Sequence, residues 1–321
     1  MGRNPRSATR PLPPRRSAPS KVAMSAMVGP PFLSPRDLAA AIGLSESSLK
    51  RWIDDGRLAV VRTAGRHRRI PLAEAVRFIR DQRMVVVDGS SLGLATPSAT
   101  SPGLSSDDAD ERVHAALLSG DPIRLRNLLS GMFLSGISLA ALADGPLCRS
   151  LRRIGELWTH GEDGIAVEHL ATDCCIHAVQ FMRSLLPPTT DDSPVALGCA
   201  PTGDPYQLPT TLAAAVLAEG GWNAVNLGPE TPVSILRLAI VRHRPRLMWV
   251  AASTETSDIP VLLKALEELT TTSKIPVVVG GRIFRERPPP RGRLLHAASL
   301  SELAGLARGL RERQDHPGIS R

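Results

Sequence analysis

The fold of the N-terminal part is governed by one stretch, residues 32–79, which reads FLSPRDLAAAIGLSESSLKRWIDDGRLAVVRTAGRHRRIPLAEAVRFI. Its apolar residues recur at helical spacing in two short runs, and the runs are interrupted at Gly43 and Gly56. Ser34 followed by Pro35 is typical of a helix start, because serine caps the free amides and proline suits the first helical position. The stretch therefore predicts a short helix, a turn and a second helix.

The second half of this stretch predicts a wing. Ser45 is placed to cap a helix over residues 46–54. Two short strands, residues 58–62 and 68–70, flank a tight turn, and a further helix over residues 72–82 completes the unit. We expect Trp52 to lie in the core and to close the second helix against the wing.

Short polar and basic side chains gather where a recognition helix would meet base edges. On the second helix they are Ser45, Ser47, Ser48, Lys50 and Arg51. In the wing they are Arg62, Arg66, His67, Arg68 and Arg69. Guanidinium groups match the geometry of phosphate, so the predicted partner is a double-stranded DNA operator. The alternative interpretation is a solvated basic hairpin on a generic helical domain.

The whole stretch resembles the winged helix-turn-helix of MerR-type regulators and excisionases. The formal net charge of +8 fits a partner of negative charge, and six basic residues without any acidic residue lie in the first 21 positions. We expect this Pro/Ser-rich arm to be disordered.

Composition places the chain as a whole among globular proteins. With 42% hydrophobic and 22% charged residues in 321, wholesale disorder is excluded. Aromatic residues make up only 3%, which argues against a stacking platform for single-stranded nucleic acid. We find no apolar run near ~20 residues and predict no membrane association. Four cysteines, two of them adjacent, form no disulfide framework and favour the cytoplasm.

Periodicity divides the chain into five parts. Residues 1–31 are the basic arm, 32–84 the winged helix-turn-helix, 85–106 a flexible Gly/Ser/Thr/Pro-rich linker, 107–186 a four-helix bundle, and 187–315 an alternation of strands and helices. The last part predicts a doubly wound parallel sheet of the flavodoxin-like type. Its expected strands are 195–200, 223–227, 246–252, 276–280 and 294–296, and its expected helices lie near 206–219, 232–243, 258–271 and 299–313.

The bundle contains a spaced motif within GELWTHGEDGIAVEHLAT, residues 155–172. Trp158 followed by Glu168 and His169 resembles the helical cap of light-sensing, cobalamin-dependent repressors of the CarH family. The resemblance implies that the Trp packs over the upper face of adenosylcobalamin and that the acid and the His bound its pocket. Many family members have a His directly after the Trp, where this chain has Thr159 and then His160. Taken one at a time, the three motif residues are better explained as bundle core, a surface acid and a hydrogen-bonded histidine, but taken together with the domain order they favour the cofactor cap.

The sheet segment resembles the cobalamin-binding fold at three loops. GDPYQLP keeps the family's acid as Asp204, but Tyr206 replaces the His that lies beneath cobalt, and Pro209 replaces a Gly. STE keeps the Ser of the second motif as Ser253 without its Leu. The third motif, Gly280–Gly281, is intact, and NLGPETP (226–232) resembles the family's second loop. The resemblance implies that a corrinoid's nucleotide tail threads between strand ends and helices, where glycine permits close approach.

The missing histidine leaves three interpretations of the pocket. A phenol with an unperturbed pKa of ~10 is a poor cobalt ligand at neutral pH. Cobalamin can bind with its own base on cobalt or without a lower protein ligand. The pocket can instead hold another tetrapyrrole, such as the linear bilin biliverdin, or it can be empty.

The motifs together predict a regulator rather than an enzyme. We expect a repressor that senses light through a tetrapyrrole between bundle and sheet and that acts as a homodimer or tetramer, as its relatives do. The alternatives are a corrinoid carrier of methyl transfer, which needs no DNA reader, and a ligand-free DNA-binding regulator. His169, Asp173 and His177 follow at helical spacing and could hold zinc, although a polar stripe is the commoner outcome. Cys174 or Cys175 could anchor a bilin, although a buried structural thiol is commoner.

Overall fold

A computed structural model describes residues 32–94, 106–156, 162–255, 258–290 and 292–315. The expected basic arm, residues 1–31, lies outside the described residues. So do Trp158, Thr159 and His160 of the bundle motif.

The N-terminal domain has the predicted helix-turn-helix order with a small antiparallel sheet. Its elements are β1 (Phe32–Leu33), α1 (Pro35–Ala41), α2 (Glu46–Asp54), β2 (Val61–Arg62), β3 (Arg68–Pro71) and α3 (Leu72–Asp81). Ser34 and Asp37 form a capping box at the start of α1, and the Ser45 side chain caps α2. The sequence missed β1, which pairs with β3 and places β3 between β1 and β2.

The first part of the expected linker is folded, which corrects the prediction of a flexible segment over residues 85–106. Asp88 caps a short 3-10 helix, η1 (Gly89–Leu92), and η1 packs against α1. Val86, Leu92 and Leu94 are buried there. These three side chains bury enough apolar surface to outweigh the turn-forming composition around them.

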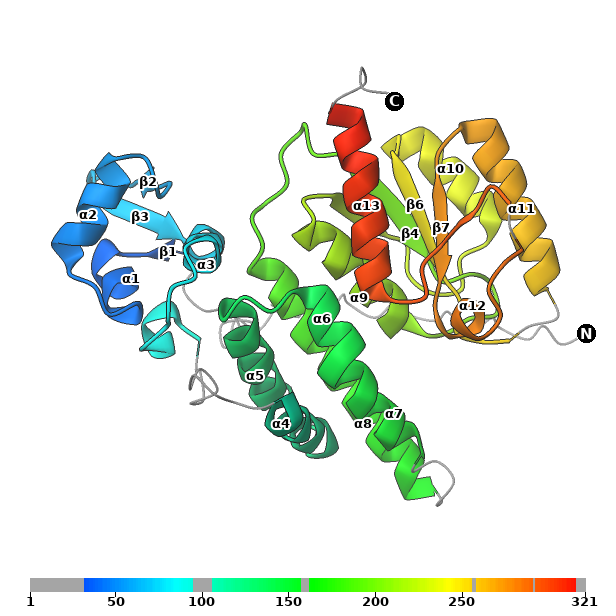
Figure 1. Cartoon of the computed structure of the whole chain (residues 1–321), viewed down its shortest axis with the longest axis horizontal. Helices are drawn as coiled ribbons and strands as arrows, with labels where there is room; N and C mark the ends of the chain where they lie inside the picture. Colours follow the sequence, from blue (N-terminus) through cyan, green and yellow to red (C-terminus); the bar gives the residue numbers. More distant parts are fainter. Residues whose placement is uncertain (1–31, 95–105, 157–161, 256–257, 291, 316–321) are drawn as a thin grey trace, which may run out of the picture.

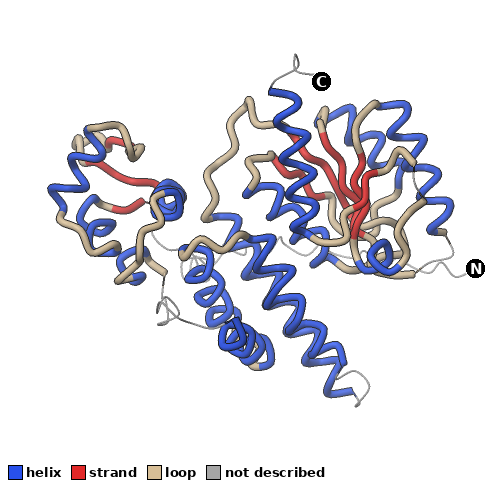
Figure 2. Tube along the Cα trace, in the orientation of Figure 1, coloured by secondary structure: helices blue, strands red, loops and turns tan. Residues whose placement is uncertain are grey.

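The middle domain is helical, as predicted. Its elements are α4 (Ser106–Leu118), α5 (Pro122–Leu134), α6 (Leu139–Leu142), the π-helical turn η3 (Ala143–Leu147), α7 (Cys148–Glu156) and α8 (Glu162–Ser184). The segments α6, η3 and α7 follow without a break and act as one helix, kinked where Gly145 leaves helical geometry before Pro146. Figure 2 shows this region as helix only, apart from its connecting loops.

The C-terminal domain is a parallel sheet covered by helices. Its elements are β4 (Val195–Cys199), α9 (Gln207–Glu219), β5 (Asn223–Asn226), α10 (Val233–His243), β6 (Leu247–Ala251), α11 (Ile259–Ser273), β7 (Val277–Gly280), α12 (Arg282–Glu286), β8 (Leu295–His296) and α13 (Leu300–Asp315). The strand order β5-β4-β6-β7-β8 is the predicted flavodoxin-like order. Helices α9 and α13 cover one face and α10 and α11 the other (Figure 1). The short helix α12 follows the glycine pair and was not foreseen.

One hydrophobic cluster runs through all three domains. It begins among the buried side chains of the N-terminal domain, continues through the bundle and ends on Leu208, Ala215 and Val216 of α9. The void between the bundle and α9 measures about 10 Å³, which is no more than one water molecule needs. The bundle is therefore closely packed against one helix of the sheet domain.

Candidate DNA interface and candidate cofactor site

Helix α2 presents the predicted recognition face to solvent. Leu49 and Ile53 point into the core, so Ser47, Lys50 and Arg51 lie on the exposed side. Lys50 pairs with Glu46 one turn earlier, with Nζ and Oε1 2.7 Å apart. An exposed pair of this kind is weak and can exchange for a phosphate at little cost.

The serines at the start of α2 form a local cluster. The Ser45 hydroxyl lies 2.9 Å from that of Ser47 and 2.8 Å from that of Ser48, and it accepts the Ser48 amide. Free amides and hydroxyls at a helix start suit contact with phosphate. Ser48 is partly buried, so Ser47 is the more accessible of the two predicted contacts.

The wing turns at Thr63–His67. The Thr63 amide donates to the His67 carbonyl, the Thr63 hydroxyl accepts the His67 amide at 3.2 Å, and Arg66 adopts a left-handed conformation at φ 59°. Arg62, Arg66 and His67 are exposed at this tip, as a phosphate contact requires.

Arg68 and Arg69 lie differently from the other wing residues. The Arg68 guanidinium binds Asp54 at the end of α2, with Nη2 and Oδ1 2.6 Å apart, and also reaches the Lys50 carbonyl at 3.4 Å. Arg69 is partly buried beside it. Arg68 thus braces the wing against the recognition helix, a role that the sequence did not indicate.

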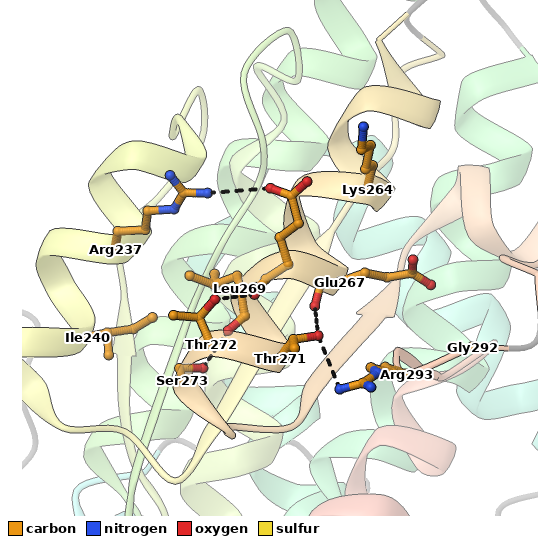
Figure 3. Close-up of a pocket in the computed structure, with 11 residues that line it drawn as sticks. Arg237, Ile240, Lys264, Glu267, Leu269, Thr271, Thr272, Ser273, Gly292 and Arg293 are labelled. Atoms are coloured by element: carbon orange, nitrogen blue, oxygen red, sulfur yellow. Dashed lines mark hydrogen bonds and ion pairs between the residues drawn. The ribbon is translucent and has the colours of Figure 1, made fainter.

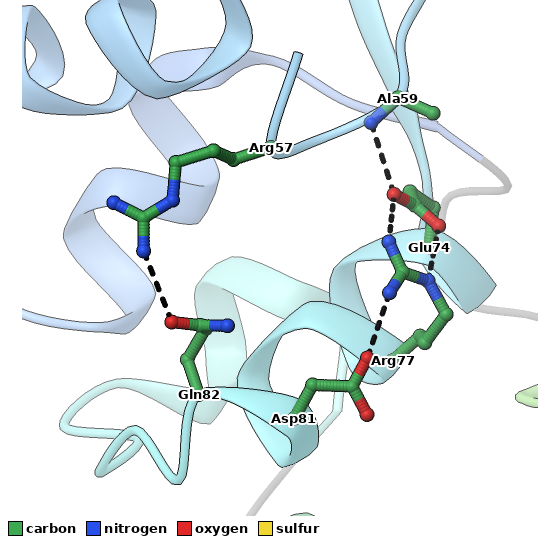
Figure 4. Close-up of polar contacts among 6 residues, drawn as sticks. All are labelled: Arg57, Ala59, Glu74, Arg77, Asp81 and Gln82. Carbon is green, nitrogen blue, oxygen red and sulfur yellow. Dashed lines mark hydrogen bonds and ion pairs between the residues drawn. The ribbon is translucent and has the colours of Figure 1, made fainter. Parts of the chain in front are cut away.

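A network on α3 holds the loop that leads into the wing (Figure 4). Glu74 accepts the Ala59 amide at 2.9 Å and two hydrogen bonds from Arg77, which also binds Asp81. Burial raises the pKa of Glu74, but the hydrogen bonds from Arg77 and Ala59 outweigh burial and leave the pKa lowered. The carboxylate therefore stays ionised and fixes the base of the wing.

Trp52 corrects one expectation. Its ring packs against Phe78 of α3, with centroids 5.6 Å apart, and the Arg57 guanidinium lies over it at 5.0 Å. Trp52 is only partly buried and seals α2 against α3 rather than against the wing. The aromatic partner lies 26 positions away in sequence, beyond the reach of a local pattern.

Arg80, at the end of α3, joins the three domains. Its guanidinium donates to the carbonyls of Phe133 and Ile137 in the bundle, the latter at 3.0 Å, and lies over the Phe133 ring at 3.6 Å. Its other nitrogen, Nη2, lies 2.9 Å from Oε1 of Glu219 on α9. Glu219 Oε2 accepts the Leu139 amide at 2.7 Å.

The Arg80–Glu219 pair is largely removed from water, with 19% of each side chain exposed. Burial raises the pKa of Glu219, while the Leu139 amide and the Arg80 charge lower it, with a net rise. Burial likewise lowers the pKa of Arg80. Each charge depends on the other because neither has bulk water to replace its partner.

Asp204, the acid that the first cobalamin-like loop keeps, binds backbone. The side chain is 1% exposed, accepts the Tyr206 amide at 3.0 Å and the Thr254 amide at 3.2 Å, and also accepts the Ser253 amide. Asp204 therefore ties the loop after β4 to the end of β6. The resemblance implied an acid that holds the histidine beneath cobalt, but this chain has Tyr206 there and the carboxylate binds backbone amides instead.

The other motif residues of the sheet also lie at the carboxyl ends of the strands. Tyr206 precedes α9 and is 44% exposed, while Ser253 is buried after β6. Gly281 adopts φ 97°, and a Cβ there would lie 2.4 Å from the Ala252 carbonyl oxygen. A Cβ on Gly280 would lie 2.9 Å from the Ala297 carbonyl oxygen. The glycine pair is thus required by the chain's own packing.

A tryptophan fills the sheet below these loops. Trp249 of β6 is 1% exposed, and its Nε1–H donates to the Thr210 hydroxyl of α9 at 3.1 Å. Thr210 donates in turn to Asn226 Oδ1 at 2.9 Å. The ring lies beside Gly198 of β4 so closely that a Cβ there would be 2.0 Å from a ring carbon. No sequence motif marked this residue.

Glu168 and His169 lie together on α8. His169 Nδ1 is 2.9 Å from the Ile165 carbonyl oxygen and 3.1 Å from Glu168 Oε2, and the imidazole is exposed. His177 reaches Asp173 at 3.5 Å. Across the described parts of the chain no three His, Cys, Asp or Glu side chains gather as metal ligands would, so the zinc interpretation gains no support. No recorded hydrogen bond or ion pair between described residues joins the α8 pair to the sheet edge.

A surface groove of about 1110 Å³ lies on the side of the sheet that α10 and α11 cover (Figure 3). It is formed by α10, the second half of α11 and the loop near Gly292. Arg237 and Glu268 face each other across it at 4.0 Å, and Arg293 reaches Thr271 at 3.2 Å. None of the predicted cofactor residues lines this groove.

Comparison with known proteins identifies two of the domains. The helix-turn-helix domain family matches residues 32–83, and the B12 binding domain family matches residues 109–182 in the bundle. Over 295 residues the chain is 28% identical to the HTH-type transcriptional repressor CarA of Myxococcus xanthus, which covers 88% of this chain and 98% of that protein. The match to a regulator agrees with the prediction of a non-enzymatic protein.

A solved structure supports the architecture of the C-terminal part. The monomethylamine corrinoid protein of Methanosarcina barkeri aligns with a TM-score of 0.50 and 14% identity, over 64% of this chain and all of that one. At this identity the likeness concerns the fold alone. The predicted order of helix-turn-helix, helical bundle and flavodoxin-like parallel sheet is confirmed.

Proposed function

We propose that this chain, a CarH-like DNA-binding regulator with a B12-binding domain, represses transcription and senses light through a tetrapyrrole held between bundle and sheet. The observation that carries the proposal is the Arg80 junction, where one side chain of the DNA-binding domain contacts both of the other domains. A change between bundle and sheet therefore has a direct physical path to the helix-turn-helix.

The coupling is thermodynamic. A ligand or its light-altered form shifts DNA affinity only if it differs in free energy between the DNA-competent and incompetent states. Helix α8 packs along α9, and Glu219 near the end of α9 holds Arg80. A displacement of the bundle from α9 would break this pair and release α3, which also fixes the wing through Glu74 and Arg77. The released bundle then associates with copies of itself to form a dimer or a tetramer.

The residues proposed to hold the chromophore come from the carboxyl edge of the sheet and from the bundle. Tyr206, Ser253 and the glycine pair lie at the sheet edge, and Glu168 and His169 lie on α8. Trp158, Thr159 and His160 join them on the resemblance alone. A bound tetrapyrrole would supply the absorption of light.

These residues do not fit a corrinoid ligated from below by the protein. Tyr206 offers a phenol where the family has an imidazole, and Asp204 is occupied by three backbone amides. Adenosylcobalamin ligated by its own base and the bilin biliverdin both remain compatible with this loop. The helix-turn-helix favours a regulator over a corrinoid carrier of methyl transfer, since a carrier has no need of DNA.

The test is a spectrum joined to a DNA-binding titration. The protein is produced with either adenosylcobalamin or biliverdin supplied, and its absorption is recorded after gel filtration. Affinity for a duplex selected by the protein from a random pool is then measured in the dark and after illumination. We expect coloured protein and a light-dependent change in affinity or in oligomer size. Protein that binds DNA but stays colourless with both chromophores would establish the ligand-free regulator instead.

A further inference from the structure

The packing of side chains between the sheet and helix α9 limits which part of a ligand can enter the sheet domain. Along β6 the side chains alternate, so Leu247 and Trp249 face α9 and α13, while Met248 and Val250 face α10 and α11. Trp249 thus lies on the side of the sheet that α9 covers. This is the space between strands and helices that a nucleotide tail would have to enter from the loops after β4 and β6.

That space is filled by the chain itself. The Trp249 ring occupies the room left by the missing side chain of Gly198, and a Cβ on Gly198 would lie within 2.0–2.5 Å of three ring carbons. Trp222 belongs to the same buried cluster but directly precedes β5, at the end of the sheet opposite to the loops that follow β4 and β6. A glycine opposite a tryptophan is packed as tightly as any other pair in a protein interior.

The indole is also fixed in place by hydrogen bonds. Its Nε1–H donates to Thr210, Thr210 donates to Asn226, and the same Asn226 oxygen accepts the Gly228 amide at 3.0 Å. Moving the ring aside would break this bond and leave the buried indole N–H without the acceptor that Thr210 provides. The chain therefore resists opening this space for a guest.

We propose that this sheet domain takes a planar tetrapyrrole that inserts no nucleotide beneath it: a tetrapyrrole without a nucleotide, or a corrinoid that keeps its nucleotide base on its own cobalt. The proposal rests on the proposed function, because it specifies the ligand of that same site. Two independent features agree with it. Tyr206 offers no imidazole to displace the ligand's own base, and Trp249 leaves no room for the displaced base.

The test compares ligands with and without the nucleotide. Absorption titrations of the full chain use cobalamin, cobinamide (the corrinoid that lacks the nucleotide) and biliverdin. We expect one of the tail-free ligands to bind at least as tightly as cobalamin. Any bound cobalamin should keep the absorption bands of its base-on form.

Variants show whether Trp249 is responsible. Trp249→Ala should raise the affinity for cobalamin relative to cobinamide by about tenfold, with a shift toward the base-off spectrum. Trp249→Leu should act in the same direction if the alanine variant folds poorly. Trp222→Ala is the matched control, because it removes an equally buried indole from the same cluster and should leave the ratio unchanged.

The outcomes separate this inference from the proposed function. Wild-type protein that binds cobalamin about tenfold more tightly than cobinamide, with its base displaced, overturns the inference and leaves the light-sensor proposal standing. Cobalamin binding gained only by Trp249→Ala supports the inference even if the wild type binds no corrinoid. Failure of wild type and variants to bind any of the three ligands overturns both.

Discussion

Asp204 shows how a residue kept from a motif can have another task. Its carboxylate accepts three backbone amides from two loops and is nearly inaccessible to water. A carboxylate that accepts several amide hydrogen bonds is held strongly, because a hydrogen bond to a charged group contributes more free energy than one to a neutral group. The presence of an acid in this loop is therefore explained by folding.

Replacing Asp204 by Asn tests this role. One carboxylate oxygen becomes an NH₂ group that faces an amide donor, so a buried N–H loses its acceptor. We expect unfolding free energy to fall by about 1–3 kcal/mol in urea titrations. Glu168→Gln, at a more exposed helical position, is the control and should change stability by less than about 0.5 kcal/mol. Equal stability of both variants would contradict the role of Asp204 in holding the two loops together.

The cysteines give a prediction from their ionisation. Burial raises the pKa of Cys175 to about 12 and that of Cys199 to about 12. Because the thiolate is the reactive form, both should resist alkylation in the folded state at pH 8, whereas the partly exposed Cys148 should react first. Mass spectrometry of briefly alkylated protein checks the order. A bilin linked covalently to Cys175 in folded protein would show this expectation to be wrong.

At the scale of elements, the wing separates contact residues from bracing residues. Arg66 is exposed at the tip of the β2–β3 hairpin, whereas Arg68 is bound to Asp54. A phosphate contact and a brace should affect DNA binding differently, since only the former releases counterions directly.

Arg66→Ala should weaken binding to all duplex sequences and lower the slope of log affinity against log salt by about 1. Arg68→Ala should weaken binding with a smaller change in slope, because it loosens the wing. Arg285→Ala, an exposed position in the sheet domain, should change neither. Fluorescence anisotropy at several salt concentrations distinguishes these outcomes. Identical slopes for wild type and Arg66→Ala would exclude Arg66 as a phosphate contact.

Local sequence patterns predict most of the helices and strands, but they fail where contacts between residues distant in sequence determine the structure. The caps at Ser34 and Ser45 and the strands β4 to β8 follow from neighbouring residues, so the sequence predicts them. Strand β1 and helix η1 exist only because β3 and α1 are present to pair and pack with them. Of the candidate site, the sequence located the loops but not Trp249, whose importance depends on Gly198 in another strand.

At the scale of the whole molecule, the Arg80–Glu219 pair spans 139 positions of sequence and connects three domains. No motif marks either residue. Since both side chains are mostly buried, removing one partner leaves the other charged without solvent, so the two should be strongly coupled. The domain arrangement therefore rests on this ion pair together with the hydrophobic cluster that runs through all three domains.

The raised pKa of Glu219 gives this junction a pH dependence. The folded state holds the Glu219 proton more tightly than the unfolded state, so the stability from this group is fully present below its ordinary pKa. That stability is lost as pH rises through the raised value. The Arg80 charge lowers the pKa of Glu219. Removing that charge should therefore raise the pKa further and move the loss of stability to higher pH. Unfolding curves of Arg80→Met and wild type between pH 4 and 8 measure the shift, and superimposable pH profiles would contradict it.

A double-mutant cycle then asks whether the junction transmits the signal. Arg80→Met and Glu219→Gln should each weaken the attachment of the DNA-binding domain, and together they should cost less stability than the sum of the single changes, with a coupling free energy of about 0.5–3 kcal/mol.

If the pair carries the signal, both variants should still bind DNA through Arg66 and the recognition helix, because neither residue lies on that face. Their DNA affinity should no longer respond to chromophore or light, since a displaced α9 has lost its hold on α3. Arg77→Met is the contrasting variant, because it loosens the wing itself and should lower DNA affinity in every state. A light response that persists unchanged in Arg80→Met would mean that the bundle reaches the DNA-binding domain by another route, and oligomer size would then be the quantity to follow.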